Sequence, residues 1–450
     1  MTSPDRGRIL DRQIRAYALP SLATLLAEPL LLASDTTMVG HLGTLPLAGL
    51  SLSSTIMSTI VGLCIFLAYA TTSATGKLVG AGKRGEAARQ GIEGMWLALG
   101  IGATLTVILF LFGEPILRLF GPDSTAFGQA ERYLHASAPG LAGMLLVLAA
   151  TGTLRGFGDT KRPMYAATAG ALANIPINYV LIYPFGWGVA GAGAGTAIVQ
   201  TGMGLWLAWQ ISTIARREGV SLLPTRGGII SSLGQAGPLI IRTLCLRAVL
   251  LAEIAVATNL GSESLAANQI TMTVWHFAAY GLDSLATAAQ ILVATAMGAR
   301  EEGVDGVREV LDRCLRFGLI TGSGLGAVLA AISFVLPRAM GATAEVGGLA
   351  TISLIVAACC LPIASVAYIL DGVLIGALDT RRLAWFMLAS LAAFAPVAWT
   401  IGQIHAIWPE TPAAILFGAL WVAYAGLFMA VRAVTMLVRA RSGKPFEADD

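Results

Sequence analysis

Apolar residues along the chain are grouped into twelve long runs, which are separated by short polar segments. Each run holds about 20 residues or more, the length that an α-helix needs to cross the hydrocarbon core of a bilayer. Hydrophobic residues make up 56% of the sequence and charged residues only 12%, which excludes a soluble globular protein. We therefore predict an all-α integral membrane protein with twelve transmembrane helices. The predicted spans are 18–40, 47–72, 92–113, 132–154, 164–184, 190–212, 232–258, 265–295, 317–337, 348–374, 384–405 and 412–436.

The second half of the chain repeats the first at an offset of 218 residues, the separation of Pro20 and Pro238. In this register Asp35 is aligned with Glu253, and both acids lie within apolar runs. A duplicated apolar chain is typical of transporters that bind their substrate between two lobes. Because each half holds six spans, an even number, both halves enter the membrane in the same orientation and the repeat is parallel.

A glycine motif follows the same repeat. The sequence Gly-x-Leu-x-Gly begins at Gly152 and, after a two-residue slip, recurs at Gly372. Small residues of this kind let membrane helices approach one another closely. We accordingly expect an N-terminal lobe of six helices (residues 1–215), a cytoplasmic linker (216–231) and a C-terminal lobe of six helices (232–450), with a central cleft between the lobes.

Basic residues are concentrated in alternate connections between the spans. Most of the 29 Lys and Arg residues fall on one side of the predicted membrane, and very few on the other. Such an asymmetry predicts that this side is cytoplasmic and that both termini lie there, in a multi-pass protein of the cytoplasmic (inner or plasma) membrane. The basic segments are 6–15, 77–89, 155–162, 216–226, 300–316, 381–382 and 432–444.

One of these basic connections carries an amphipathic pattern. Val304, Val307, Leu311 and Leu315 recur at helical spacing with charged residues between them. The pattern predicts a helix that lies on the membrane surface.

An Asp-Thr-basic turn occurs twice, beginning at Asp159 and at Asp379. The residues before the first turn, Gly156-Phe-Gly158, resemble half of the signature of intramembrane aspartyl proteases. The partner Tyr-Asp dipeptide of that signature is absent from the sequence, so we do not predict an enzyme. We expect the two turns to cap helices at the cytoplasmic surface.

Five carboxylates lie inside predicted spans: Glu28, Asp35, Glu253, Asp283 and Asp371. A charged residue at the centre of a span costs about 2.5–3.5 kcal/mol on insertion scales. These side chains should therefore face water or one another rather than lipid.

The first half combines Asp35 with two asparagines of the fifth span. Asn174 and Asn178 are one turn apart on the same helical face, and Asn178 matches Asp35 in depth. Glu28 lies nearly on the same stripe as Asp35, close to mid-bilayer. A buried carboxylate beside amide oxygens suits either proton exchange or a cage for a small hard cation such as Na⁺. A purely structural hydrogen-bond cluster that joins the helices is the alternative.

In the second half, the neighbours of each acid decide its interpretation. Arg242 lies eleven residues before Glu253 on the same helical face, so a structural ion pair is as good an interpretation of Glu253 as ion handling. Asp283 and Asp371 lie towards the cytoplasmic ends of their spans, where a gate, a bond between helices or ion handling would each fit. We include Gln290 among these second-lobe polar or gating residues.

Several segments together resemble the multidrug and toxic compound extrusion (MATE) transporters. They are Asp35-Thr-Thr-Met-Val-Gly40-His-Leu-Gly43 with Pro20 ahead of it, Ala267-Asn-Gln-Ile270, Asp283-Ser-Leu-Ala-Thr-Ala-Ala-Gln290, and Asp371-Gly-Val-Leu-Ile-Gly-Ala-Leu-Asp-Thr-Arg381. The last three resemble the DinF-like branch. The resemblance covers essentially the whole chain and implies a two-lobed fold of twelve helices. It also implies export of cationic or amphipathic compounds in exchange for entering H⁺ or Na⁺.

The resemblance also assigns roles to individual residues. Asp35 matches the ion-coupling aspartate of the first helix, Asn174 an asparagine of the fifth, and Pro20 a proline that helps the first helix bend. Asn178 stands where some DinF-like relatives have a second aspartate, which leaves the coupling ion open.

From these observations we predict a monomeric antiporter that works by alternating access on small molecules in a lipid bilayer. We expect no cofactor and no nucleic-acid partner. The alternative is a flippase for lipid-linked precursors, in which Arg242 and Arg247 would hold a pyrophosphate.

Overall fold

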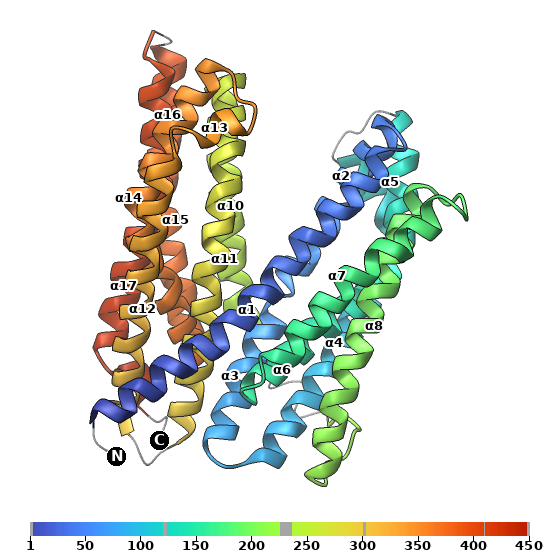
Figure 1. Cartoon of the computed structure of the whole chain (residues 1–450), viewed down its shortest axis with the longest axis vertical. Coiled ribbons are helices and arrows are strands. Elements are labelled where there is room, and N and C mark those ends of the chain that lie inside the picture. Colours follow the sequence, from blue (N-terminus) through green and yellow to red (C-terminus); the bar gives the residue numbers. More distant parts are fainter. Residues whose placement is uncertain (1–2, 120–123, 226–235, 300–302, 409, 448–450) are drawn as a thin grey trace. The chain divides into compact units, whose positions relative to one another are not determined.

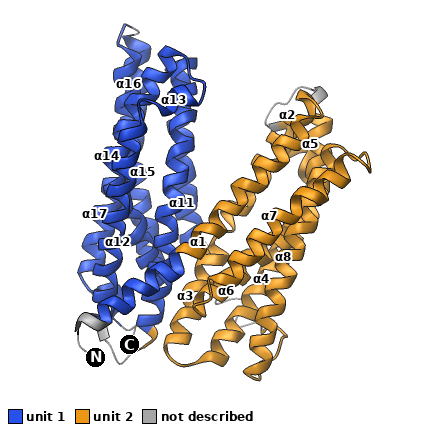
Figure 2. Cartoon of the chain, viewed as in Figure 1, with its two compact units in different colours: residues 1–18, 238–297, 301–450 blue, residues 19–237, 298–300 orange. Residues whose placement is uncertain are grey.

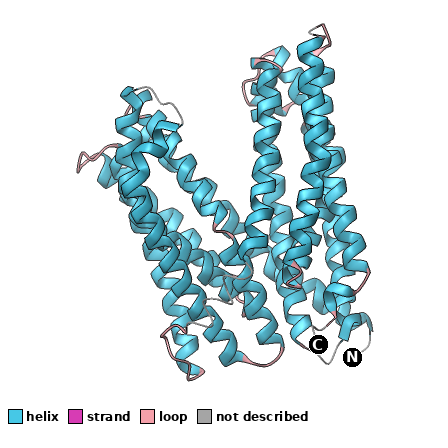
Figure 3. Cartoon of the chain, turned by 180° about the vertical axis from the view of Figure 1, so that it is seen from behind, coloured by secondary structure: helices cyan, strands magenta, loops and turns pink. Residues whose placement is uncertain are grey.

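Helices form all the regular secondary structure in the part of the chain that the structure describes (Figures 1 and 3). The computed structural model describes residues 3–119, 124–225, 236–299, 303–408 and 410–447. The all-α fold predicted from the apolar runs is therefore confirmed.

The first half of the chain forms the helices up to α8. They are α1 (Ser3–Gly40), α2 (Thr44–Leu63), α3 (Phe66–Gly80), α4 (Arg84–Leu119), α5 (Ser124–Ser137), the 3₁₀ turn η1 (Ala138–Gly140), α6 (Leu141–Gly156), α7 (Lys161–Ile182) and α8 (Val189–Arg217).

The second half forms the helices from α10 onward. They are α10 (Ala236–Asn259), α11 (Ser262–Gly298), α12 (Gly303–Ile332), α13 (Leu336–Ala339), α14 (Ala344–Gly376), α15 (Thr380–Ile407), α16 (Ala413–Trp421), the π-helical segment η3 (Val422–Phe428), α17 (Met429–Arg441) and the 3₁₀ turn η4 (Lys444–Phe446).

Twelve helical segments among the described residues are long enough to cross a membrane. Ten of them are also apolar enough by composition. The other two are α8, with 29 residues, and α10, with 24 residues. α8 begins with a run of Gly and Ala, and α10 carries Arg242, Arg247 and Glu253, which makes both less apolar than the rest.

The chain divides into two compact units (Figure 2). Unit 1 comprises residues 1–18, 238–297 and 301–450, and unit 2 comprises residues 19–237 and 298–300. The division runs through α1, between Ala18 and Leu19. Of the predicted linker 216–231, residues 226–231 lie outside the described part of the chain.

The repeated glycine motif makes the same helix contact in both units. In unit 2, a Cβ atom on Gly152 would lie 2.3 Å from the backbone oxygen of Ala68 in α3. In unit 1, a Cβ atom on Gly372 would lie 2.2 Å from the backbone oxygen of Ala286 in α11. Since Ala68 and Ala286 are themselves 218 residues apart, the contact follows the register of the repeat. Any larger residue at either glycine would push two helix backbones apart.

The predicted surface helix at 304–315 is wrong. These residues form the first turns of α12, which continues without a break to Ile332. The amphipathic pattern arises because one side of these turns packs in unit 1, where Val307, Leu311 and Leu315 are buried. An amphipathic stretch can extend a transmembrane helix beyond the bilayer as readily as it can lie on its surface.

The two Asp-Thr-basic turns have diverged in their contacts. Asp159 caps α7 as predicted, since its Oδ1 accepts hydrogen bonds from the backbone N–H groups of Lys161 (3.1 Å) and Arg162 (3.0 Å). Asp379 makes no side-chain cap on α15. Its Oδ2 instead accepts a hydrogen bond from Nε of Arg439 in α17, at 2.6 Å.

Candidate functional site

A cluster of polar side chains in unit 2, buried except for the half-buried Thr196, joins α1, α7 and α8. Asp35 comes from α1, Asn174 and Asn178 from α7, and Thr196 from α8. Asp35 is only 3% exposed, and both asparagines are completely buried. The structure thus brings Asp35 together with Asn178, which the sequence pattern placed at the same depth, and with Asn174, one turn away on the same face.

Every hydrogen bond to the Asp35 carboxylate within this cluster comes from a neutral group. Asn178 donates from Nδ2 to Asp35 Oδ1 at 2.5 Å, and Thr196 donates from Oγ1 to Asp35 Oδ2 at 2.9 Å. Asn178 also donates to Oδ1 of Asn174 at 3.0 Å. Nδ2 of Asn174 lies 3.5 Å from Oγ1 of Thr196 and closes the ring. No described Lys, Arg or His side chain forms an ion pair with Asp35.

Gly195 allows α8 to approach α7 closely enough for this ring to form. A Cβ atom at that position would lie 1.8 Å from Oδ1 of Asn178. The same Oδ1 atom is buried and has no hydrogen-bond partner among the described residues. A buried amide oxygen without a donor is a natural ligand for a cation or for an added proton donor.

Sequence reasoning missed Thr196 and the neighbouring Tyr133 of α5, which is buried beside Thr196 and close to Asp35. Both belong to helices whose predicted spans gave no hint that they meet α1. The only available signal for Thr196 is its place directly after Gly195, in the glycine-rich first part of α8.

The other two predicted residues of α1 lie apart from this buried ring. The side chain of Glu28 is exposed, so it is not among the buried groups around Asp35. Pro20 is buried inside α1, and Pro29 is a second proline of the same helix. A proline inside a helix removes one backbone hydrogen bond, so the hydrogen bonding of α1 is interrupted at two positions before Asp35.

Unit 1 holds a second buried acid, Glu253 of α10, which is completely buried. Asn268 of α11 donates from Nδ2 to Glu253 Oε2 at 3.1 Å. Trp421, at the end of α16, donates from Nε1 to Oδ1 of Asn268 at 3.0 Å. The second carboxylate oxygen, Oε1, has no hydrogen-bond partner among the described residues. Among the described residues, Glu253 and Arg242 form no ion pair with each other.

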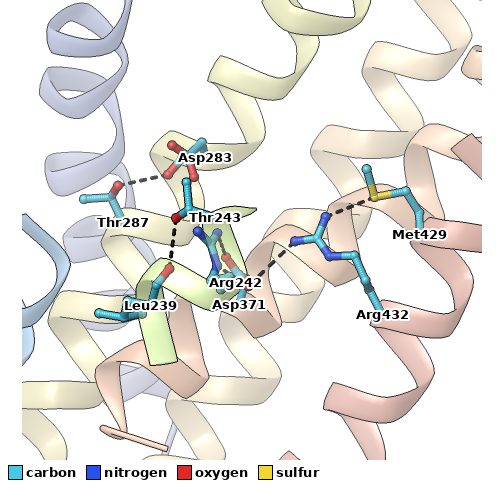
Figure 4. Close-up of polar contacts among 8 residues, drawn as sticks. All are labelled: Leu239, Arg242, Thr243, Asp283, Thr287, Asp371, Met429 and Arg432. Atoms are coloured by element: carbon cyan, nitrogen blue, oxygen red, sulfur yellow. Dashed lines mark hydrogen bonds and ion pairs between the residues drawn. The ribbon is translucent and has the colours of Figure 1, made fainter. Parts of the chain in front are cut away.

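Arg242 instead pairs with Asp371 of α14, in a buried group of charges (Figure 4). Arg242 donates from Nε to Asp371 Oδ1 at 3.1 Å and from a terminal nitrogen to Oδ2. Arg432 of α17 lies on the other side, with its terminal nitrogen 3.7 Å from Asp371 Oδ1. Its guanidinium group also lies over the rings of Tyr368 and Phe428. Sequence reasoning treated Arg432 only as part of a basic segment, yet it is 2% exposed.

Asp283 and Gln290, both of α11, complete the predicted polar residues of unit 1. Asp283 lies close to the Arg242–Asp371 pair in Figure 4, and its backbone oxygen accepts a hydrogen bond from Thr287 at 3.0 Å. Gln290 is buried, and its backbone lies against Gly376 at the glycine contact between α11 and α14.

The two units therefore differ in the partners of their buried aspartates, which are neutral for Asp35 and positively charged for Asp371. The described residues contain no group of three or more His, Cys, Asp or Glu side chains that could hold a metal ion. A cation in unit 2 would have to be bound by one carboxylate together with amide and hydroxyl oxygens, a set that fits a proton or a hard monovalent ion.

Known proteins resemble this chain over both of its halves. The profile of the MatE family matches residues 20–180 and 238–400. The protein DETOXIFICATION 44, chloroplastic, of Arabidopsis thaliana is 30% identical over 399 residues, covering 85% of this chain and 75% of the relative. The DNA damage-inducible protein F of Escherichia coli (strain K12) is 28% identical over 414 residues, covering 88% of each chain.

A solved structure supports the fold over nearly the whole chain. The Vibrio cholerae MATE transporter VcmN in its bent form superposes with a TM-score of 0.86 at 20% identity, covering 98% of this chain and 99% of the other. The family profile covers both halves of the repeat, in the register that the sequence predicts. The chain belongs to the MatE family of membrane transporters, which confirms the family that the sequence motifs predicted.

Proposed function

We propose that this MATE transporter exports amphipathic or cationic small molecules in exchange for a cation that binds at Asp35. The observation that carries the proposal is the Asp35 carboxylate, buried in a ring of neutral donors with no described cation beside it. A buried carboxylate without a counter-ion is unstable as an anion, so it gains most from an incoming proton or Na⁺.

The ring supports both candidate ions. A proton would neutralise Asp35 directly, and the carbonyl oxygen of the resulting acid would still accept one of the hydrogen bonds from Asn178 and Thr196. A Na⁺ ion would use the carboxylate together with the amide oxygens of Asn174 and Asn178, one of which, Oδ1 of Asn178, has no described donor. Because Asn178 is not an acid, only one titratable carboxylate is present, which favours exchange of a single charge.

One charge is sufficient to drive useful export. A monovalent cation that enters across about 150 mV releases about 3.5 kcal/mol, since 100 mV is worth about 2.3 kcal/mol. This sustains a gradient of roughly 300-fold for a neutral substrate.

The burial of Asp35 supports an alternating-access cycle. At 3% exposure the Asp35 side chain is almost closed off from water in this conformation, so loading and releasing an ion would be eased by movement of α1 away from α7 and α8. Pro20 lies two residues after the point where α1 passes from one compact unit to the other. We assign Pro20 as the hinge of that movement, with Pro29 as a second flexible point.

A pocket of unit 2 is a candidate for the substrate. It has a volume of ≈ 540 Å³ and lies on α7 and α8, the helices that supply Asn174, Asn178 and Thr196. Its walls are aromatic, aliphatic and thioether groups, including Tyr165, Met203 and Trp206. An adaptable apolar surface with aromatic faces suits amphipathic cations.

For its setting we propose a monomer in a cytoplasmic (inner or plasma) membrane, with both termini on the cytoplasmic side. The asymmetry of the basic residues supports this orientation.

The test is efflux of a fluorescent cationic dye from proteoliposomes in which a pH gradient and a Na⁺ gradient are imposed separately. We expect one of the two gradients to drive export by the wild-type protein and neither to drive export by Asp35→Asn. Gradient-driven export that persists undiminished in Asp35→Asn would refute the assignment of the ion site.

The flippase alternative loses its main support. The flippase hypothesis requires Arg242 to bind a pyrophosphate, but its guanidinium group pairs with the buried Asp371. Arg247 is exposed on α10, and a single arginine is a weak pyrophosphate site.

A further inference from the structure

A groove in unit 1 combines two arginines with an apolar floor. It has a volume of ≈ 520 Å³ and lies on α12, α14 and α17. α12 contributes a helical stripe at i, i+3, i+4, i+7 and i+8, and α17 contributes two residues one turn apart. The lining residues are Asp312, Leu315, Arg316, Leu319, Ile320, Val366, Leu437 and Arg441.

The polar and apolar parts of this groove are separated along the helix axes. Arg316 is one turn before Ile320 on α12, and Arg441 is one turn after Leu437 on α17, a displacement of about 6 Å in each case. Both arginines therefore lie nearer to the end of unit 1 that carries the two chain termini (Figure 1). Leu319 and Ile320 are 44% and 63% exposed, so the apolar floor is open to the surroundings of the helices.

Neither arginine is neutralised by a carboxylate in the described part of the chain. Four other arginines at this end of unit 1 have carboxylate partners, namely Arg6 with Glu309, Arg308 with Asp305, Arg313 with Asp11, and Arg439 with Asp379. Arg316 and Arg441 form no ion pair with any carboxylate among the described residues. Asp312 lines the same groove without pairing with Arg316, so the lining keeps one excess positive charge.

We propose that this groove binds an anionic phospholipid of the surrounding bilayer. Its phosphate would lie between the guanidinium groups of Arg316 and Arg441, and an acyl chain would lie along Leu319, Ile320 and Leu437. Guanidinium groups bind phosphate through paired hydrogen bonds, and basic pockets between transmembrane helices are suited to acidic headgroups. The exposed apolar floor, one turn deeper in the membrane, is what commits the site to a lipid rather than to a soluble phosphate.

The test compares two pairs of substitutions in the full-length protein, purified in a neutral detergent. The first pair is Arg316→Gln with Arg441→Gln, and the matched control is Arg381→Gln with Arg382→Gln, two exposed arginines of α15 outside the groove. Phosphatidylglycerol, phosphatidylcholine and inorganic phosphate are titrated as separate probes. Bound lipid is measured by native mass spectrometry, and the shift in melting temperature is followed in parallel.

We expect the groove pair to weaken phosphatidylglycerol binding about 30-fold, because each basic residue near a membrane surface contributes about fivefold. The control pair should weaken it less than about threefold, because charges outside the site are screened. A further pair, Arg316→Lys with Arg441→Lys, keeps the charge and should retain most of the binding even if the Gln pair folds poorly.

Three outcomes would overturn the proposal. The groove pair could bind phosphatidylglycerol as well as the wild-type protein does, or both Gln pairs could lose binding equally, which would indicate only a diffuse surface charge. Alternatively, inorganic phosphate alone could reproduce the stabilisation, which would make the site one for a soluble anion.

Discussion

Asp35 and Asp371 are both buried aspartates inside membrane helices, yet their surroundings are opposite. Asp35, in unit 2, receives hydrogen bonds from an amide and a hydroxyl group. Asp371, in unit 1, contacts two guanidinium groups, those of Arg242 and Arg432. Neutral donors leave the Asp35 carboxylate without a counter-ion, whereas two arginines surround Asp371 with permanent positive charge.

Glu253 lies between these two extremes. It occupies the position of Asp35 in the repeat and is just as buried, but its partners are Asn268 and, through it, the indole of Trp421. Burial alone thus does not distinguish the three acids from one another. The number and charge of the donors around each acid do so, and substitutions can test that distinction.

The largest effect is expected for Asp35→Asn. The substitution keeps the shape of the side chain but removes the only titratable carboxylate of the ring, so ion-driven export should fall to the level of protein-free liposomes. Dye efflux under an imposed gradient measures this. The melting temperature should stay close to that of the wild-type protein, and a collapse of folding would mean that the acid is structural instead.

Asp371→Asn should chiefly affect stability. It leaves the guanidinium groups of Arg242 and Arg432 buried without their shared anion, and breaking such a buried pair costs about 3–5 kcal/mol. Chemical unfolding in detergent measures the loss. As a control, Asp305→Asn breaks the exposed pair with Arg308 and should cost less than about 1 kcal/mol. If the two substitutions lower the free energy of unfolding by the same amount, the charges around Asp371 do not stabilise the fold.

Thr196→Val sharpens the comparison within unit 2. It preserves the side-chain shape but removes the hydroxyl that donates to Oδ2 of Asp35. Hydrogen bonds to charged groups are worth about 1.5–3 kcal/mol, so the apparent affinity for the coupling ion should change by roughly 10-fold or more. Thr213→Val, in the same helix, removes only a local bond to the backbone of Gln210 and serves as the control. Equal ion affinities in both variants would exclude Thr196 from the site.

Glu253→Gln should have the smallest effect on transport. The amide of Gln retains an oxygen that can accept the hydrogen bond from Asn268, so export should change by less than about fivefold, the equivalent of one neutral hydrogen bond. The measurement is the same gradient-driven efflux. Loss of coupling as complete as in Asp35→Asn would show that both halves of the repeat load an ion.

Much of the fold and part of the site could be predicted from the sequence. The apolar runs predict the helices, because length and composition are enough to identify a membrane span. The internal repeat predicts that Gly152 corresponds to Gly372. Asp35, Asn174 and Asn178 could be grouped because helical spacing and depth relate residues that face one another across two spans.

The sequence could not show which residue of another helix each polar side chain contacts. Arg242 shares a helical face with Glu253, but eleven residues correspond to about 16 Å along the axis, which is too far for direct contact. Its actual partner, Asp371, is brought to it by the packing of α14 against the rest of unit 1. Thr196 and Arg432 were missed for the same reason, since neither has a neighbour in the sequence that marks it as polar and buried.

The glycine contacts at Gly152 and Gly372 bear on how the two halves evolved. Because these seams are made by backbone against backbone, they depend on the absence of side chains and tolerate changes elsewhere on the same helices. After duplication, mutations at the polar positions could accumulate while the scaffold of each copy was maintained. The two copies could thereby surround their buried acids with different partners, and the asymmetry between the halves needs no change of architecture to explain it.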